Sequence, residues 1–227
     1  MIKAIIFDLD GTLLDRHASL QKFIVHQYER LNEYLGQVPK DQYISRFIEL
    51  DHRGYVWKDK VYEQLVSEFS ISGISWQELL DDYVREFHKC CIAFPNLHEM
   101  LGELHGKVQL GIITNGRGQF QMDNIKALGI EQYFSSILVS EWEGMSKPQP
   151  EIFEKSVSDL GVLPSESLYV GDHPKNDIKG AQAVGMKAAW KRDPFWDKAD
   201  ADFVIDDLME IPLLIWGNKY VRNYGRY

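Results

Sequence analysis

Cysteine, long apolar runs and excess positive charge are all scarce in this sequence. The only two of its 227 residues that are cysteines, Cys90 and Cys91, are neighbours and indicate neither a disulfide framework nor a zinc site. No apolar run approaches the ~20 residues of a membrane span. The formal net charge of -9 argues against nucleic-acid binding, which needs a footprint of lysine and arginine.

The start of the chain has no signal-peptide pattern, because it runs directly into an apolar, strand-like stretch. We therefore expect a cytoplasmic protein that binds neither membranes nor nucleic acid. Its content of 44% hydrophobic and 26% charged residues suits one large or two modest globular domains. The basic, aromatic tail 218–227 is too short to indicate nucleic-acid binding. The oligomeric state, monomer or homodimer, stays open.

Strand-like runs alternate with helix-like ones over most of the chain. The predicted strands are 3–8, 108–114, 137–140, 167–171, 187–190 and 203–205, and the predicted helices between the later ones are 119–128, 151–160 and 178–184. A glycine follows each of these three helices, which is a common helix stop. The alternation predicts an α/β fold with a Rossmann-like parallel sheet.

Residues 16–93 do not follow this alternation. Helix-period apolar residues recur over 20–35, 40–50, 59–69 and 75–90, with no clear strand among them. A structureless loop of this length is rare, so we expect an all-helical cap domain at 16–93 and a catalytic core made of 1–15 and 94–227. The return to the core lies near Phe94-Pro95-Asn96, a natural boundary.

Two carboxylates lie two residues apart near the start of the chain, in Asp8-Leu9-Asp10-Gly11-Thr12. Residues two apart on a strand face the same side, and a chain that is leaving the strand can curl the second carboxylate over the first. Open α/β sheets bind ligands at this carboxyl edge. The motif therefore indicates a reactive site, although a polar turn uses the same residue types.

Two later segments carry groups that can bind an anion. Thr114 and Asn115 follow a predicted strand and enter a helix, so that hydroxyl, amide and backbone N–H groups are available to phosphate oxygens. Lys147 precedes Pro148, which suits a helix start and leaves the lysine just outside the helix. Taken singly, Thr114 and Asn115 also fit a helix cap, and Lys147 fits a solvated surface lysine.

A fourth segment, Gly171 to Asp177, supplies two more carboxylates at the end of an apolar strand. Asp172 follows a strand-terminating glycine at the functional edge of the predicted sheet. Asp177 fits either this site or the N-cap of a helix that begins at Ile178.

Together these segments supply acidic groups, one lysine and neutral donors at the ends of strands. Mg²⁺ takes oxygen ligands, usually a few carboxylates with phosphate and water, and Asp8, Asp172 and a backbone carbonyl can provide them. Lys147 can offset charge on a transferring phosphoryl group, whose oxygens Thr114 and Asn115 can hold. A carboxylate can then act as nucleophile and form an aspartyl-phosphate.

The pattern resembles the haloacid dehalogenase (HAD) superfamily of aspartate-nucleophile phosphohydrolases. The four motifs of that superfamily occur here in order, as Asp8-Leu9-Asp10-Gly11-Thr12, Thr114-Asn115, Lys147 and Gly171-Asp172 with Asp177. The resemblance spans residues 1 to about 204 and implies a Rossmann-like core with a helical cap. It also implies a Mg²⁺-dependent phosphatase that acts on a small phosphorylated metabolite.

The resemblance further implies individual roles. Asp8 would be the nucleophile and a Mg²⁺ ligand, whereas Asp10 would be the general acid and base and would offer its backbone carbonyl to the metal. This division is chemically reasonable, because Asp8 must stay ionised while Asp10 must give and take a proton. Asp172 would complete the metal shell, and Asp177 would support it.

The phosphate would be bound by the remaining motif residues. Thr114 and Lys147 are the main candidates implied by the resemblance. Asn115, Gly116 and the backbone at Leu9 are further candidates.

Three other activities or roles stay open. Dehalogenases of the superfamily share the aspartate nucleophile, but they act without Mg²⁺ and lack the second aspartate, so the presence of Asp10 and Asp172 favours phosphate-ester hydrolysis. A sugar phosphomutase would pass the same phosphoryl group to a sugar hydroxyl instead of water, with cap closure excluding water. A non-catalytic binding module would be expected to lack at least one motif residue.

Substrate selection is expected to come from the cap. Candidates are His17 and the break between helices at His52 to Tyr55, where Arg53 could meet a second anionic group. Tyr55 or Trp57 could stack on a base or cover a sugar. An ordinary surface arginine and aromatic residues of the cap core are the simpler explanation of the same sequence.

Overall fold

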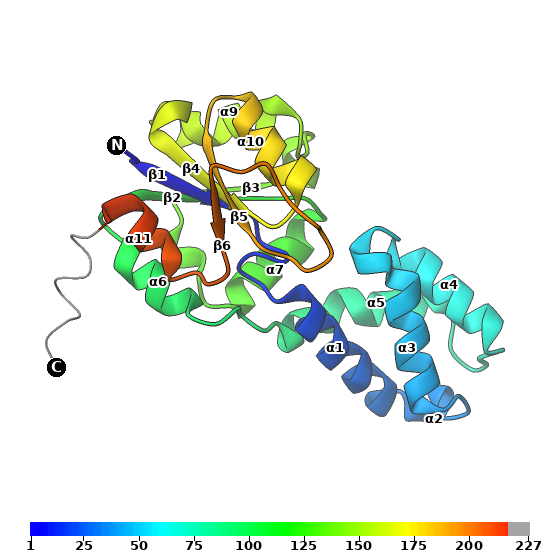
Figure 1. The fold of residues 1–227 in the computed structure, drawn as a ribbon. Helices are drawn as coiled ribbons and strands as arrows, with labels where there is room; N and C mark the ends of the chain where they lie inside the picture. Colours follow the sequence, from blue (N-terminus) through cyan, green and yellow to red (C-terminus); the bar gives the residue numbers. More distant parts are fainter. Residues whose placement is uncertain (218–227) are drawn as a thin grey trace, which may run out of the picture. The chain divides into compact units, whose positions relative to one another are not determined.

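The computed structural model describes residues 1–217, and the basic, aromatic stretch 218–227 lies outside the described residues. The chain divides into two compact units (Figure 1), a sheet unit of Met1–Asp15 with Ala93–Tyr227 and a helical unit of Arg16–Ile92. Over residues 1–217, no helix is both long enough and apolar enough to cross a membrane.

The sheet unit is built on six parallel strands in the order β3-β2-β1-β4-β5-β6. The strands are β1 Ala4–Phe7, β2 Gln109–Thr114, β3 Ser136–Val139, β4 Ser167–Gly171, β5 Lys187–Lys191 and β6 Phe203–Ile205. All four residues of the central strand β1 are buried, as expected where helices cover both faces of a parallel sheet. The predicted α/β fold with a parallel sheet is confirmed.

The strand order places a ligand-binding edge beside β1. From β1 the chain builds outward through β2 and β3 and then crosses back to β4 on the other side of β1. Open α/β sheets bind ligands at the carboxyl ends of strands where the order reverses in this way. Phe7 pairs with Ile112 of β2 and Val170 of β4, so Asp8 leaves β1 at this reversal point.

Helices pack on both faces of the sheet, with α9 and α10 on one side and α6 and α11 on the other in Figure 1. The helices of this unit are α6 Leu97–Leu104, α7 Gly118–Ala127, α8 Ser140–Glu143, α9 Pro150–Asp159, the π-helix η5 Pro174–Lys179, α10 Gly180–Ala183 and α11 Glu210–Trp216, with 3₁₀ turns η3 Glu131–Tyr133 and η4 Pro164–Glu166. On one face, Ile6 and Ile113 of the sheet share a buried core with Phe153 of α9 and Ala181 of α10.

The helix after β4 begins earlier than the sequence predicts. It starts at Pro174, and the ring of His173 accepts hydrogen bonds from the backbone N–H groups of Lys175 and Asn176. The prediction of a helix start at Ile178 is therefore wrong, and so is the alternative reading of Asp177 as its N-cap. An imidazole nitrogen caps this helix, and Asp177 lies inside its first turn.

The helical unit contains only helices and connecting turns, namely α1 Arg16–Arg30, α2 Asn32–Leu35, α3 Lys40–Asp51, the 3₁₀ turn η1 His52–Gly54, α4 Lys58–Glu68, α5 Trp76–Glu86 and the 3₁₀ turn η2 Phe87–Cys90. The single helices predicted at 20–35 and 75–90 are each split in two, the first at Leu31 and the second after Glu86.

A buried ion cluster holds the helical unit together. The Asp51 carboxylate, which is buried at the end of α3, accepts hydrogen bonds from Arg16 of α1 and Lys58 of α4. The cluster therefore ties three helices at the point where the chain turns through η1. Beyond that turn Tyr55 and Trp57 are 52% and 62% exposed, so these two aromatic residues do not belong to the core of the unit.

Replacing Ile6 with alanine should destabilise the sheet unit by about 2–5 kcal/mol, because it opens a cavity in the core under the central strand. Urea unfolding followed by circular dichroism measures this change. Leu163→Ala is the matched control, since Leu163 is 62% exposed and its truncation should change stability by less than about 0.5 kcal/mol. Equal effects of the two substitutions would contradict the assignment of the core.

Candidate active site

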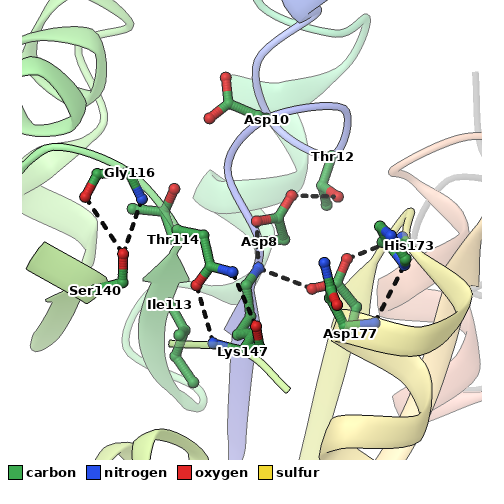
Figure 2. Close-up of polar contacts among 12 residues, drawn as sticks. Asp8, Asp10, Thr12, Ile113, Thr114, Gly116, Ser140, Lys147, His173 and Asp177 are labelled. Carbon is green, nitrogen blue, oxygen red and sulfur yellow. Dashed lines mark hydrogen bonds and ion pairs between the residues drawn. The ribbon is translucent and has the colours of Figure 1, made fainter. Parts of the chain in front are cut away.

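A buried lysine and a buried aspartate form the centre of the site. The Lys147 Nζ atom donates to Asp8 Oδ1 at 2.5 Å and to Asp177 Oδ1 at 2.8 Å (Figure 2). Lys147 is 5% exposed and Asp8 is also 5% exposed, so the interpretation of Lys147 as a solvated surface lysine is wrong. The Thr12 hydroxyl donates to the other Asp8 oxygen, Oδ2, at 3.3 Å, which leaves both carboxylate oxygens of Asp8 oriented.

Asn115 fixes the backbone that carries Lys147. Its amide Nδ2 donates to the Lys147 carbonyl at 3.0 Å, and its Oδ1 accepts from the Lys147 N–H at 2.9 Å. This reciprocal pair joins the end of β2 to the loop before α9. The side-chain amide that the sequence suggests for phosphate binding is thus engaged by the Lys147 backbone. Asn115 positions the lysine.

Asp177 and Tyr169 complete the surroundings of the lysine. The Tyr169 hydroxyl accepts from Lys147 Nζ at 3.0 Å and lies 3.2 Å from Asp177 Oδ1, while the other oxygen of Asp177 accepts from the His173 N–H at 2.9 Å. Gly171 makes room for this arrangement, since a Cβ there would lie 2.5 Å from the Asp177 Cβ. Asp177 therefore reaches the site only because a glycine ends β4.

Three carboxylates from two strand ends come close enough to share one cation. Ligand oxygens of Asp8, Asp172 and Asp177 all lie within 4.8 Å of one another. Lys147 contacts Asp8 and Asp177, and its one positive charge does not balance three negative ones. Hard oxygen donors in this number suit a divalent metal ion, so the residues present fit such an ion.

Burial and the neighbouring charges shift the pKa values of the groups in this cluster. Burial raises the pKa of Asp8 to about 7, with Lys147 opposing the shift and Asp177 adding to it. Burial and the charges of Asp8 and Asp177 also raise the pKa of Asp172 well above its usual range. Burial alone lowers the pKa of Lys147, but the Asp177 and Asp8 carboxylates outweigh it and raise that pKa well above its usual range. The lysine is thus a fixed positive charge.

The second half of the site lies around Asp10 and Thr114. Thr114 ends β2 and is fully buried. Its hydroxyl accepts a hydrogen bond from Gln121 of α7 at 2.6 Å, and the same Gln121 amide donates to Asp10 Oδ2 at 2.6 Å. In Figure 2, Asp10 stands apart from the contacts around Lys147. The two aspartates of the motif therefore have different partners.

The backbone beyond Thr114 is engaged within the loop. The Gly116 N–H donates to Ser140 Oγ at 2.9 Å (Figure 2). The sequence suggests this N–H as a further phosphate donor, and the structure gives it to Ser140 instead.

The structure thus brings Asp8, Lys147, Asp172 and Asp177 into one cluster and links Asp10 to Thr114. Sequence reasoning missed Tyr169 and Gln121. Tyr169 stands two positions before Gly171 on a buried strand, where a phenolic hydroxyl needs a partner. Gln121 stands in the first turn of the helix after Thr114, and its burial there follows from packing that no sequence pattern reveals.

The fold places these residues at the carboxyl edge of a parallel α/β sheet, and comparisons with known proteins show the family to which it belongs. A family model for haloacid dehalogenase-like hydrolases matches residues 5–191. A glyceraldehyde 3-phosphate phosphatase of Pyrococcus abyssi is 32% identical over 202 residues, which cover 84% of this chain and 81% of that protein. The chain belongs to the haloacid dehalogenase-like hydrolase family.

Solved structures of the family superpose on nearly the whole chain. A HAD phosphatase from Thermococcus onnurineus is 28% identical, with a TM-score of 0.68 and coverage of 95% of this chain and 99% of that one. A 2-haloacid dehalogenase from Pseudomonas syringae is also 28% identical, with a TM-score of 0.64 and coverage of 95% and 98%. Structural similarity therefore does not distinguish a phosphatase from a dehalogenase, and the distinction rests on the residues of the site.

The raised pKa of Asp8 predicts how stability depends on pH in the metal-free protein. The pKa rises from 3.8 to about 7 on folding, so between these pH values the folded state holds more protons than the unfolded state. The contribution of Asp8 to stability is then fully present below about pH 4 and is lost as the pH rises through about 7. In EDTA, the stability of wild type relative to Asp8→Asn should fall over this range.

Thermal unfolding between pH 4 and 8 measures this difference. Asp81→Asn is the control, because Asp81 is exposed on α5 and its replacement should give a difference that does not vary with pH in the same window. A wild-type minus Asp8→Asn difference that is flat or rises with pH would rule out a carboxyl of raised pKa at this position.

Proposed function

We propose that this protein is a metal-dependent phosphatase that hydrolyses monoesters of small phosphorylated metabolites through an aspartyl-phosphate on Asp8. The observation that carries this proposal is the buried Lys147 that contacts Asp8 at the carboxyl end of β1. A fixed cation beside a carboxylate that leaves the central strand suits attack on an anionic phosphoryl group.

In the first step, an Asp8 carboxylate oxygen forms a bond to phosphorus while the bond between phosphorus and the ester oxygen breaks. Asp10 gives its proton to the departing oxygen, which leaves as an alcohol. In the second step, Asp10 takes a proton from water, the water oxygen bonds to phosphorus, and the bond from phosphorus to Asp8 breaks. Phosphate is released and both aspartates return to their starting states.

The phosphoryl oxygens are attracted by the positive charge of Lys147 and accept a hydrogen bond from the Thr114 hydroxyl. Both groups are immobilised beforehand, Lys147 by Asn115 and the carboxylates, and Thr114 by its strand and Gln121. Preorganised donors of this kind stabilise developing charge without having to reorient.

A divalent metal ion, Mg²⁺ by the chemistry of its oxygen donors, would be held by Asp8, Asp172 and the backbone carbonyl of Asp10, with Asp177 supporting the set. When bound, it supplies positive charge that offsets the negative charge on the phosphoryl group. The cluster of carboxylates supports this assignment, because its negative charges exceed the single charge of Lys147.

The helical unit is proposed to act as the cap that selects the substrate. It enters directly after the Asp8 motif and returns at Ala93, before α6, so it interrupts the sheet unit close in sequence to the Asp8 motif. Lids inserted at such points exclude water and add specificity in many enzymes. Arg53 lies in the left-handed turn η1, and Tyr55 and Trp57 follow it. All three stay candidates for substrate contact.

A dehalogenase is the second candidate, because one of the similar structures is that of a 2-haloacid dehalogenase. A dehalogenase hydrolyses an ester formed on its nucleophilic aspartate, and this reaction needs neither a second acid nor a metal-binding carboxylate. The presence of Asp10 and the cluster of Asp172 with Asp8 therefore favours the phosphatase.

Hydrolysis of para-nitrophenyl phosphate tests the proposal. Wild type with Mg²⁺ should be active, EDTA should abolish activity, and Asp8→Asn should lower kcat by about 10⁴-fold or more because the nucleophile is removed. Asp81→Asn, an exposed aspartate on α5, should retain full activity. The acid-quenched enzyme should carry one phosphoryl group on Asp8 by mass spectrometry.

Other outcomes would redirect the assignment. Hydrolysis that survives both EDTA and Asp8→Asn would refute the mechanism. Chloride release from 2-chloropropionate, with no hydrolysis of phosphate esters, would establish the dehalogenase. Phosphoryl exchange between sugar phosphates without hydrolysis would point to a mutase, and inactivity toward a broad panel of phosphate esters would point to a binding module.

A further inference from the structure

Gln121 connects the two parts of the site that the motifs leave separate. It lies in the first turn of α7 and is 2% exposed. Its Nε2 donates its two protons to Asp10 Oδ2 and Thr114 Oγ1, each at 2.6 Å, and also lies 3.2 Å from the Asn115 carbonyl. One buried amide thus contacts the proposed acid and base and the proposed phosphate ligand.

The orientation of this amide is fixed by its neighbours. Asn124, fully buried one turn further along α7, donates from Nδ2 to Gln121 Oε1 at 3.2 Å. A flipped amide would set its oxygen against the Asp10 carboxylate and its NH₂ against the NH₂ of Asn124, and both contacts are unfavourable. Gly116 makes room for the Gln121 side chain, since at its φ of +151° a Cβ would lie 3.0 Å from Gln121 Cγ.

We propose that Gln121 is a positioning residue that holds the Asp10 carboxylate through Oδ2, so that Oδ1 is the oxygen that serves the leaving group and the water. This inference rests on the proposed function, in which Asp10 protonates the leaving oxygen. An N–H group donating to Oδ2 favours that oxygen as the carbonyl of the protonated acid, so the proton resides on Oδ1. Within residues 1–217, Gln121 is the hydrogen-bond partner of the Asp10 carboxylate, and Oδ1 has none.

The proton then has a defined path. It moves from Asp10 Oδ1 to the leaving oxygen as the ester bond breaks, and Oδ1 later takes a proton from the attacking water. Gln121 exchanges no proton and keeps its bond to Oδ2 in both states.

The contact with Thr114 works by the same rule. The Thr114 hydroxyl has one proton, and its oxygen accepts from Gln121. That proton therefore remains for a substrate oxygen. This second effect acts on the phosphoryl group and is independent of the leaving group, so the two effects can be measured separately.

Gln121→Met tests the proposal, because methionine keeps the unbranched shape and removes the donor. The substrates are phenyl phosphate and para-nitrophenyl phosphate, two aryl phosphates that differ by one nitro group and therefore in how much their leaving oxygen needs a proton. For phenyl phosphate, kcat/KM should fall about 10- to 100-fold, the effect expected of a misplaced catalytic group. For para-nitrophenyl phosphate it should fall less, and the ratio of the two losses reports on Asp10.

The matched control is Gln119→Met, two positions earlier on the same helix, where the side chain is exposed and bonds to Asp123. It should leave both values of kcat/KM unchanged. Gln121→Asn is the second variant, in case the Gln121→Met protein does not fold. It keeps a polar amide of shorter reach and should show the same selective loss. Circular dichroism and the thermal midpoint verify that each variant is folded.

A double-mutant cycle separates positioning from a general structural role. In an Asp10→Asn background, Gln121→Met should no longer change the ratio between the two substrates, because the proton donor that it orients is absent. An equal loss on both substrates, or a selective loss that persists without Asp10, would overturn the inference. The proposed function is contradicted by a different result, namely that Asp10→Asn hydrolyses phenyl phosphate as fast as wild type.

Discussion

The contact between Lys147 and Asp8 is the constraint on which the rest of the site depends. Burying a lone charge costs several kcal/mol, so the lysine is stable inside the sheet edge only because Asp8 and Asp177 both accept its hydrogen bonds. The surrounding residues follow from that requirement. Asn115 fixes the loop of the lysine, Tyr169 takes its third N–H, and the glycine at 171 admits Asp177. Even so, one cation among three carboxylates leaves negative charge, which suits a metal ion.

The two aspartates of the opening motif differ in environment more than in sequence. Asp8 is buried and held by a cation and a hydroxyl, an arrangement that suits a group which must attack and carry a phosphoryl group. Asp10 is partly exposed and is held by a neutral amide. A neutral partner does not bind a carboxylate as strongly as a cation does, which agrees with the acid and base role proposed for Asp10. Partner chemistry thus supports a different role for each aspartate.

Much of the architecture was predictable, because apolar runs of β-branched residues and glycine stops report on burial and chain direction locally. All six strands lie within a residue or two of their predicted places, and Gly129, Gly161 and Gly185 end helices with φ of +67°, +67° and +87°. The helix start at Pro174 was missed, because its cap is a histidine ring and not one of the usual capping side chains. Gln121 and Tyr169 were missed, because their importance comes from residues far away in the chain.

By itself, the sequence determined the fold class and the residues at the ends of the strands, because both are written in local patterns of apolar, turn-forming and acidic residues. It also determined which chemical groups are available to the site. Only the tertiary structure decided how they are used. Packing turned Lys147 from a candidate surface residue into a buried cation, gave the Asn115 amide to the lysine backbone and placed Gln121 between Asp10 and Thr114. Apart from Thr114 and Gln121, which are 7 positions apart, these contacts join residues 22 to 139 positions apart, and no local pattern specifies them.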